Sequence, residues 1–160
     1  MTADLATMTG IDAPTGLLIG GRWGTGRGGT LPVTDPSTED VIAQVANATG
    51  EDALDAVAAA HDALAGWSAR PPRERGECLR RAFDLMIDRT EALARLMVVE
   101  NGKALRDARG EITYAAEFFR WYSEEAVRVP GTLATAPSGT NKIVVQHRPV
   151  GICVLVTPWN

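Results

Sequence analysis

The final ten residues constrain the fold more than any other part of this chain. Ile152–Val156 is hydrophobic at every position, a pattern typical of a strand buried on both faces in a parallel sheet covered by helices. Pro158 cannot donate to a strand ladder, so the strand is expected to stop in the turn Thr157–Asn160. Open α/β sheets bind ligands at the carboxyl ends of their strands, and the Asn160 side chain offers two N–H donors there. The sequence therefore predicts an α/β fold. Its last turn is either an ordinary strand-end turn, which these four residues alone favour, or a ligand site.

Short β segments are expected toward both ends of the chain. Residues 1–15 are small and polar and are expected to form a mobile arm. Further short strands are expected at residues 17–19 and 22–23, around a tight Gly20–Gly21 turn, and at residues 30–34 and 41–45. Pro32 restricts its strand to a sheet edge. Residues 131–139 are expected to be a loop, followed by a strand over 142–148 that has no obvious partner nearby.

Four helices are expected between these groups of strands. Thr49 is a plausible N-cap, with Asp52 three residues later as in a capping box. Pro71–Pro72 is suited to opening the second helix, and Asn101–Gly102 to closing the third in a left-handed cap. The fourth helix is the longest and is expected from about residue 105 to residue 129.

Charge and residue counts exclude several classes of function. A net charge of -4 argues against nucleic acid and anionic membrane as partners, and no apolar stretch approaches the length of a membrane span. The first ten residues hold no Lys or Arg, so no secretory signal is expected. The two cysteines and two histidines show no metal-binding spacing, so no metal site is expected. Two isolated thiols fit a reducing, cytoplasmic compartment.

Three motifs favour structural interpretations. Gly24–Gly29 spells G-x-G-x-x-G, but a β-type segment follows it where a dinucleotide fingerprint needs a helix, so a hairpin loop is expected. Cys153 has only apolar neighbours and nothing to activate its thiol, which favours packing. The arginines between residues 70 and 81 alternate with Glu74 and Glu77, as on a solvated, salt-bridged helix face.

Large aromatic side chains follow a small residue along one side of the fourth helix. Gly110, Tyr114, Phe118 and Trp121 stand at i, i+4, i+8 and i+11. Such a side could wall an apolar tunnel, or it could form a wide contact with another helix, which is the more frequent arrangement. The spacing alone leaves both open.

Taken together, several segments resemble the aldehyde dehydrogenase superfamily. The final turn Thr157–Asn160, preceded by Arg148–Gly151, resembles the superfamily signature. Glu100–Lys103, Ala108–Glu111 and Phe118–Ala126 resemble the succinate-semialdehyde dehydrogenase branch. The likeness runs from about residue 17 to residue 160 in the family's own order, so the chain resembles an amino-terminal piece of a longer enzyme.

The resemblance implies a reaction and roles for the residues of the final turn. Such enzymes oxidise an aldehyde to an acid with NAD or NADP, through a cysteine adduct and a thioester. Asn160 matches the side-chain donor that stabilises the developing oxyanion. Thr157, Pro158 and Trp159, with Asn160, match the segment along the nicotinamide–ribose half of the cofactor. Tyr114 and Phe118 lie on the helix that borders the substrate entrance, which favours the tunnel.

The same resemblance implies a domain layout. It divides the chain into a flexible arm at 1–15, a partial NAD(P)-binding domain at 16–133 and 150–160, and an oligomerisation arm at 134–149. The catalytic domain, with the nucleophilic cysteine and the general base, would lie beyond Asn160, so the chain alone is expected to be inactive. A homodimer or homotetramer is expected for the whole enzyme. Exposed strands would make the isolated piece aggregation-prone.

Two alternatives remain at this point. The substrate could be another small aldehyde, such as betaine aldehyde or one without a carboxylate, in place of succinate semialdehyde. The chain could also be a non-catalytic helical adaptor, in which the helices between residues 49 and 129 support β segments that dock a partner.

Overall fold

The computed structural model describes residues 5–158, in which a short helix and two antiparallel hairpins precede four helices and a third hairpin. Three hairpins form from strands β1 and β2, β3 and β4, and β5 and β6. The elements within the described residues are α1 (Leu5–Thr9), β1 (Leu17–Ile19), β2 (Arg22–Gly24), β3 (Thr30–Thr34), β4 (Val41–Ala46), α2 (Gly50–Ala69), α3 (Pro72–Asp88), α4 (Thr90–Asn101), α5 (Leu105–Glu125), β5 (Thr132–Thr135) and β6 (Lys142–Val145). The chain is thus a mixed α/β structure. None of the helices among these residues is both long and apolar enough to cross a bilayer.

The predicted helix boundaries are largely confirmed. Thr49 and Asp52 form a reciprocal capping box at the start of α2, and Pro72 begins α3. Gly102 closes α4 with φ 77°, in the left-handed region. Helix α5 ends at Glu125, about one turn before the predicted end, and Pro130 disfavours helical geometry at the residue that precedes it.

The buried core is small and lies between α4 and α5, with α3 packed along α5. A Cβ added to Gly76 of α3 would lie 2.6 Å from the carbonyl oxygen of Ser123, so these two helices touch through their backbones. The buried hydrophobic residues are Ala94, Ala108, Ile112 and Ala116.

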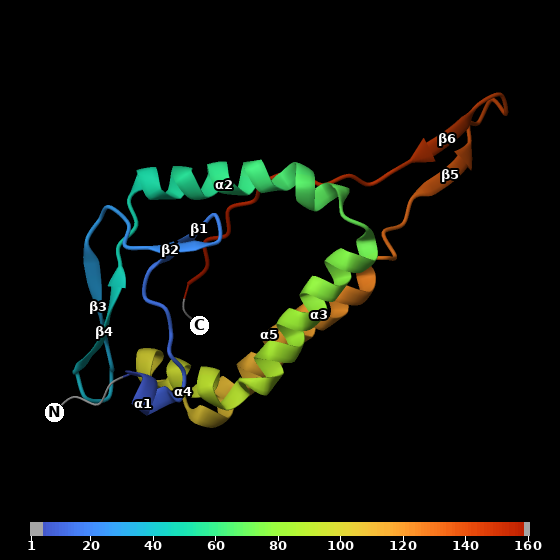
Figure 1. Cartoon of the computed structure of the whole chain (residues 1–160). Helices are drawn as coiled ribbons and strands as arrows, with labels where there is room; N and C mark the ends of the chain where they lie inside the picture. The colour runs from blue at the N-terminus through green and yellow to red at the C-terminus, as the bar shows by residue number, and fades with distance from the viewer. Residues whose placement is uncertain (1–4, 159–160) are drawn as a thin grey trace.

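Much of the apolar surface of the chain is uncovered. Its accessible surface is 11640 Å², whereas a complete folded protein of its mass exposes about 7,700 Å². In Figure 1 the helices form an open frame, with α2 along one side and the α3–α5 pair along another. The described residues therefore bury much less surface than a self-sufficient domain does.

Two predictions about the ends of the chain are wrong in part. The segment predicted as a flexible arm contains helix α1, which packs against α4 and buries Thr9. The strand predicted to lack a neighbour pairs with β5, within the predicted loop, and aligns Leu133 with Val144. The β5–β6 hairpin projects away from the helices (Figure 1), and both strands are exposed along their whole length.

The predicted buried strand Ile152–Val156 does not form in this structure. The segment has no regular secondary structure, and Val154, Leu155 and Val156 are 73%, 86% and 90% exposed. A strand buried on both faces needs strands beside it and helices on each side, and among the described residues no strand pairs with this segment. The parallel sheet predicted from this segment is therefore absent from the part of the chain described.

One ionic network fixes the start of α2. The buried carboxylate of Asp52 accepts hydrogen bonds from the Thr49 backbone N–H at 2.8 Å, the Arg27 backbone N–H at 3.1 Å and the Thr49 hydroxyl at 2.8 Å. The Arg27 guanidinium adds a contact at 2.6 Å. These donors, the Thr49 backbone N–H foremost, hold the pKa of Asp52 well below its usual range.

This network predicts a pH-dependent stability. Because the pKa of Asp52 is lower in the folded chain, its ionised form stabilises the fold above the ordinary Asp pKa of about 3.9, and this contribution is lost as the pH falls below it. Asp52→Asn should therefore lower the melting temperature at neutral pH, and the difference from wild type should shrink below about pH 4. Circular dichroism melts from pH 3 to pH 7 measure the difference.

Asp55→Asn is the matched control. Asp55 binds the same Arg27 guanidinium at 2.8 Å but is 54% exposed, so its removal should cost much less. Equal losses for the two variants, or a gap that widens on acidification, would contradict the role given to Asp52.

Candidate functional site

The final turn lies at the limit of the described residues. Thr157 and Pro158 are exposed and have no regular secondary structure, whereas Trp159 and Asn160 lie outside the described residues. The oxyanion role of Asn160 and the cofactor role of the turn therefore stay predictions. Because Ile152–Val156 is not paired here, the carboxyl end of a sheet, where such a site is built, is not assembled by the described residues.

The glycine-rich segment Gly24–Gly29 has the conformation of a loop. It joins β2 to β3, so it connects two hairpins and is not the turn of one. The backbone N–H of Gly28 donates to the carbonyl oxygen of Asn47 at 3.1 Å, which ties the loop to the end of β4. Strand β3 follows it, so no helix begins directly after the glycines as the dinucleotide fingerprint requires.

The aromatic side of α5 forms an open depression. The rings of Tyr114 and Phe118 meet edge to face, with centroids 5.1 Å apart and planes at 87°. Together with Glu117, Trp121 and Tyr122 they line a hollow of about 340 Å³. All of these residues belong to one helix, and Tyr114 is 67% exposed. The structure therefore places the two tunnel candidates together on an open face, and Thr157 and Pro158 do not line the hollow.

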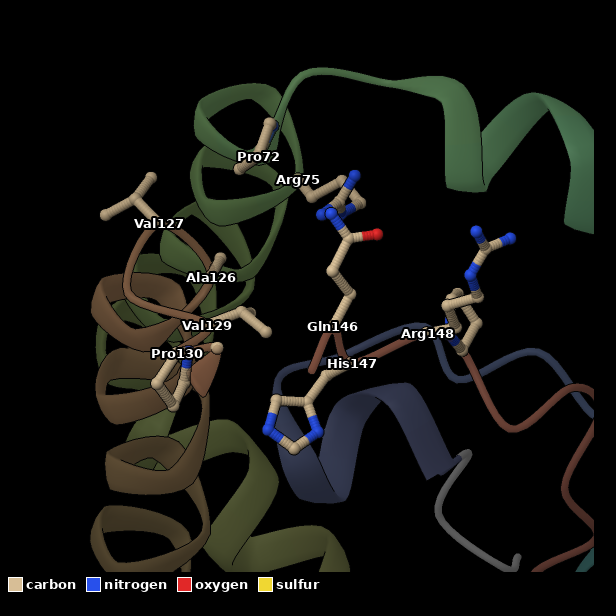
Figure 2. A pocket seen from close by; sticks show the side chains of 11 residues that line it. Pro72, Arg75, Ala126, Val127, Val129, Pro130, Gln146, His147 and Arg148 are labelled. Carbon is tan, nitrogen blue, oxygen red and sulfur yellow. The ribbon is translucent and has the colours of Figure 1, made fainter. Parts of the chain in front are cut away.

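A larger pocket lies at the base of the β5–β6 hairpin. It has a volume of about 570 Å³ and is formed by the start of α3, the segment after α5 and the chain returning from β6. In Figure 2 the Gln146 side chain extends toward Arg75, whereas the His147 ring turns the other way. No carboxylate or thiol is among the residues that line it, and its titratable side chains are Arg75, His147 and Arg148.

Arg75 in this pocket has a structural role. Its guanidinium donates to the carbonyl oxygens of Ser68 and Arg70 and closes the end of α2. The predicted salt bridges to Glu74 and Glu77 are not formed by the arginines of this segment in the described residues; Arg80 instead pairs with Asp84 at 3.1 Å. Sequence reasoning missed the pocket because its walls come from segments far apart in the chain.

Two ion pairs connect α5 to α4 and to the segment that follows α4. The Arg109 guanidinium of α5 donates hydrogen bonds to both carboxylate oxygens of Glu91 in α4, at 2.6 and 2.8 Å. These bonds lower the pKa of Glu91. Lys103 pairs with Glu111.

Cys153 is exposed here, against the prediction that it packs. Its exposure follows from the unformed strand.

Known proteins match nearly the whole chain. The aldehyde dehydrogenase family matches residues 23–160. A succinate-semialdehyde dehydrogenase of Paenarthrobacter nicotinovorans is 55% identical over 120 residues, which cover 75% of this chain and 27% of that protein. Succinate-semialdehyde dehydrogenase [NADP(+)] 1 of Schizosaccharomyces pombe is 36% identical over 158 residues, covering 98% of this chain and 32% of that protein.

A solved structure agrees with these sequence matches. The crystal structure of succinate-semialdehyde dehydrogenase from Burkholderia pseudomallei superposes with a TM-score of 0.81 at 39% identity, covering 84% of this chain and 28% of that one. The chain thus spans about a third or less of the length of these relatives. The resemblance seen in the sequence is confirmed: the chain belongs to the aldehyde dehydrogenase family.

Proposed function

We propose that this chain is the amino-terminal part of an NAD(P)-dependent dehydrogenase that oxidises succinate semialdehyde to the acid. The 55% identity over 120 residues to a succinate-semialdehyde dehydrogenase carries the proposal. The name of the yeast relative includes NADP(+), which supports a nicotinamide cofactor without deciding between NAD and NADP. Family membership makes the adaptor alternative the weaker one.

The described residues do not form a dinucleotide site by themselves. Residues 152–158 are exposed and have no regular secondary structure, and the glycine-rich loop leads into a strand. In the proposed enzyme, further strands from the rest of the protein would pair with Ile152–Val156 and place Thr157–Asn160 at a sheet edge. The neutral amide of Asn160 would then donate a hydrogen bond to the oxyanion that develops as the aldehyde carbonyl is attacked.

The β5–β6 hairpin is proposed as the oligomerisation arm. It stands clear of the helices (Figure 1), and its two strands are exposed and carry free backbone edges. Such edges suit pairing with a strand of another subunit. A homodimer or homotetramer of the whole enzyme would use them, whereas the chain alone leaves them uncovered.

Substrate preference in the whole enzyme tests the proposal. Succinate semialdehyde should exceed butyraldehyde in kcat/KM by about 10- to 100-fold, since hydrogen bonds to a charged group contribute about 1.5–3 kcal/mol. Steady-state kinetics with NAD and with NADP measure both preferences. The 160-residue chain, assayed alone as the control, should turn over neither aldehyde. Equal values for the two aldehydes, or faster turnover of betaine aldehyde, would contradict the substrate.

A further inference from the structure

We propose that Asn101–Gly102 is a latent deamidation site, held unreactive by the end of α4 and able to loosen the contact between α4 and β3 once it reacts. The proposal rests on this segment alone and does not depend on the dehydrogenase activity. Among the four asparagines of the chain, Asn101 is the one followed by glycine. A glycine offers no Cβ to hinder attack by its own backbone nitrogen.

The reaction needs no partner other than water. The backbone nitrogen of Gly102 attacks the side-chain carbonyl carbon of Asn101, and a five-membered succinimide forms. The side-chain nitrogen leaves as ammonia and takes the proton of the Gly102 amide. Water then opens the ring at either carbonyl and leaves aspartate or isoaspartate at position 101.

The C-terminal cap of α4 keeps the backbone nitrogen of Gly102 in a hydrogen bond. The Gly102 N–H donates to the carbonyl oxygen of Val98 at 2.7 Å, and Gly102 has φ 77° and ψ 13°. Asn101 is the last residue of α4, so its side-chain carbonyl and the following nitrogen are held in helix-end geometry. Attack requires this hydrogen bond to break and the last turn to open. The rate of deamidation in the folded chain is therefore set by local opening of α4.

The same cap is packed against the turn after β3. A Cβ added to Gly102 would lie 2.9 Å from Cγ of Pro36, so little space separates the two. Isoaspartate would insert an extra carbon into the backbone at this point, and the Gly102 N–H would lose its register with Val98. Either product also puts a carboxylate at the negative end of the α4 dipole, directly after Glu100. Both changes favour opening of the cap.

Peptide mass spectrometry of the 160-residue chain tests the site. The chain is incubated in mildly alkaline buffer, with and without concentrated urea, and deamidation is followed at each asparagine. Asn101 should react in urea and at least about tenfold more slowly without it, which corresponds to an opening free energy of about 1.4 kcal/mol. Asn47 and Asn141, followed by alanine and lysine, should stay unmodified over the same period. Hydrogen exchange at the Gly102 amide reports whether the cap is closed.

Two variants test separately whether Asn101 is the residue that reacts and whether its product opens the α4 cap. Asn101→Gln should abolish the reaction and keep the Gly102 amide protected, whereas Asn101→Asp should lower that protection about two- to fivefold. If Asn101 stays unmodified in urea, it is not a deamidation site. If the rates with and without urea are equal, or if the Gly102 amide of the wild type is unprotected, the α4 cap does not control the reaction. Wild-type protection in Asn101→Asp would overturn the loosening of the cap.

Discussion

Replacing Asn160 by alanine in the complete enzyme should lower kcat by about 10²–10³, the usual cost of removing one oxyanion donor. The physical reason is that the amide is proposed to donate to an oxygen that carries negative charge only after the carbonyl is attacked. The lost stabilisation therefore belongs to the transition state, so kcat and kcat/KM should fall together while KM changes little. Steady-state kinetics with succinate semialdehyde measure the change.

Asn141→Ala is the matched control for this variant, since Asn141 is an exposed asparagine just before β6. It should retain wild-type kcat. Retention of more than a tenth of wild-type kcat by Asn160→Ala would remove Asn160 from the oxyanion role. A rise in KM with unchanged kcat would show that the amide binds substrate and transition state equally.

Val154→Asp should destabilise the complete enzyme much more than the 160-residue chain. If Ile152–Val156 becomes a central strand in the complete enzyme, the variant buries an unpaired carboxylate and should lose about 3–5 kcal/mol, a large fraction of a typical folding free energy. In the chain described here Val154 is 73% exposed, so the same change should cost less than about 0.5 kcal/mol. Soluble yield and thermal melts of both proteins measure the contrast.

Thr25→Asp provides the control, because it places the same charge at an exposed position between β2 and β3, outside the proposed oligomerisation arm. It should leave the stability of both proteins nearly unchanged. Wild-type stability of Val154→Asp in the complete enzyme would show that the segment is not an interior strand, and the proposed place of Thr157–Asn160 at a sheet edge would fail with it.

Local signals predicted the helices well because each boundary depends on a few neighbouring residues. The Thr49–Asp52 box and the Gly102 cap need only the backbone of one helical turn to be satisfied, and both are present in the structure. The Gly20–Gly21 turn between β1 and β2 is equally local, since both glycines adopt positive φ as such a hairpin requires. The family could also be recognised from short motifs in order along the chain.

Predictions that depended on distant residues were less successful. Helix α1 packs against α4, about ninety residues away. The partner of β6 lies close to it in the sequence, but residues 131–139 contain Gly, Pro and Ser as a loop does, so β5 was not predicted. The strand Ile152–Val156 was inferred from its apolar side chains, but strand formation requires neighbours to accept its backbone hydrogen bonds. Tyr114 and Phe118 were rightly placed on one side of a helix, although what covers that side is not encoded in their spacing.

The sequence by itself determined the helix limits, the tight turns and the family, because those depend on residues close together in the chain. Only the tertiary structure decided which faces are buried: the small Ala94–Ala108–Ile112 core, the Asp52–Arg27 network and the exposed aromatic side of α5. Burial is a property of surfaces brought together from distant segments. A pattern of apolar residues indicates which face of an element must be buried. Only the tertiary structure shows whether another segment packs against that face.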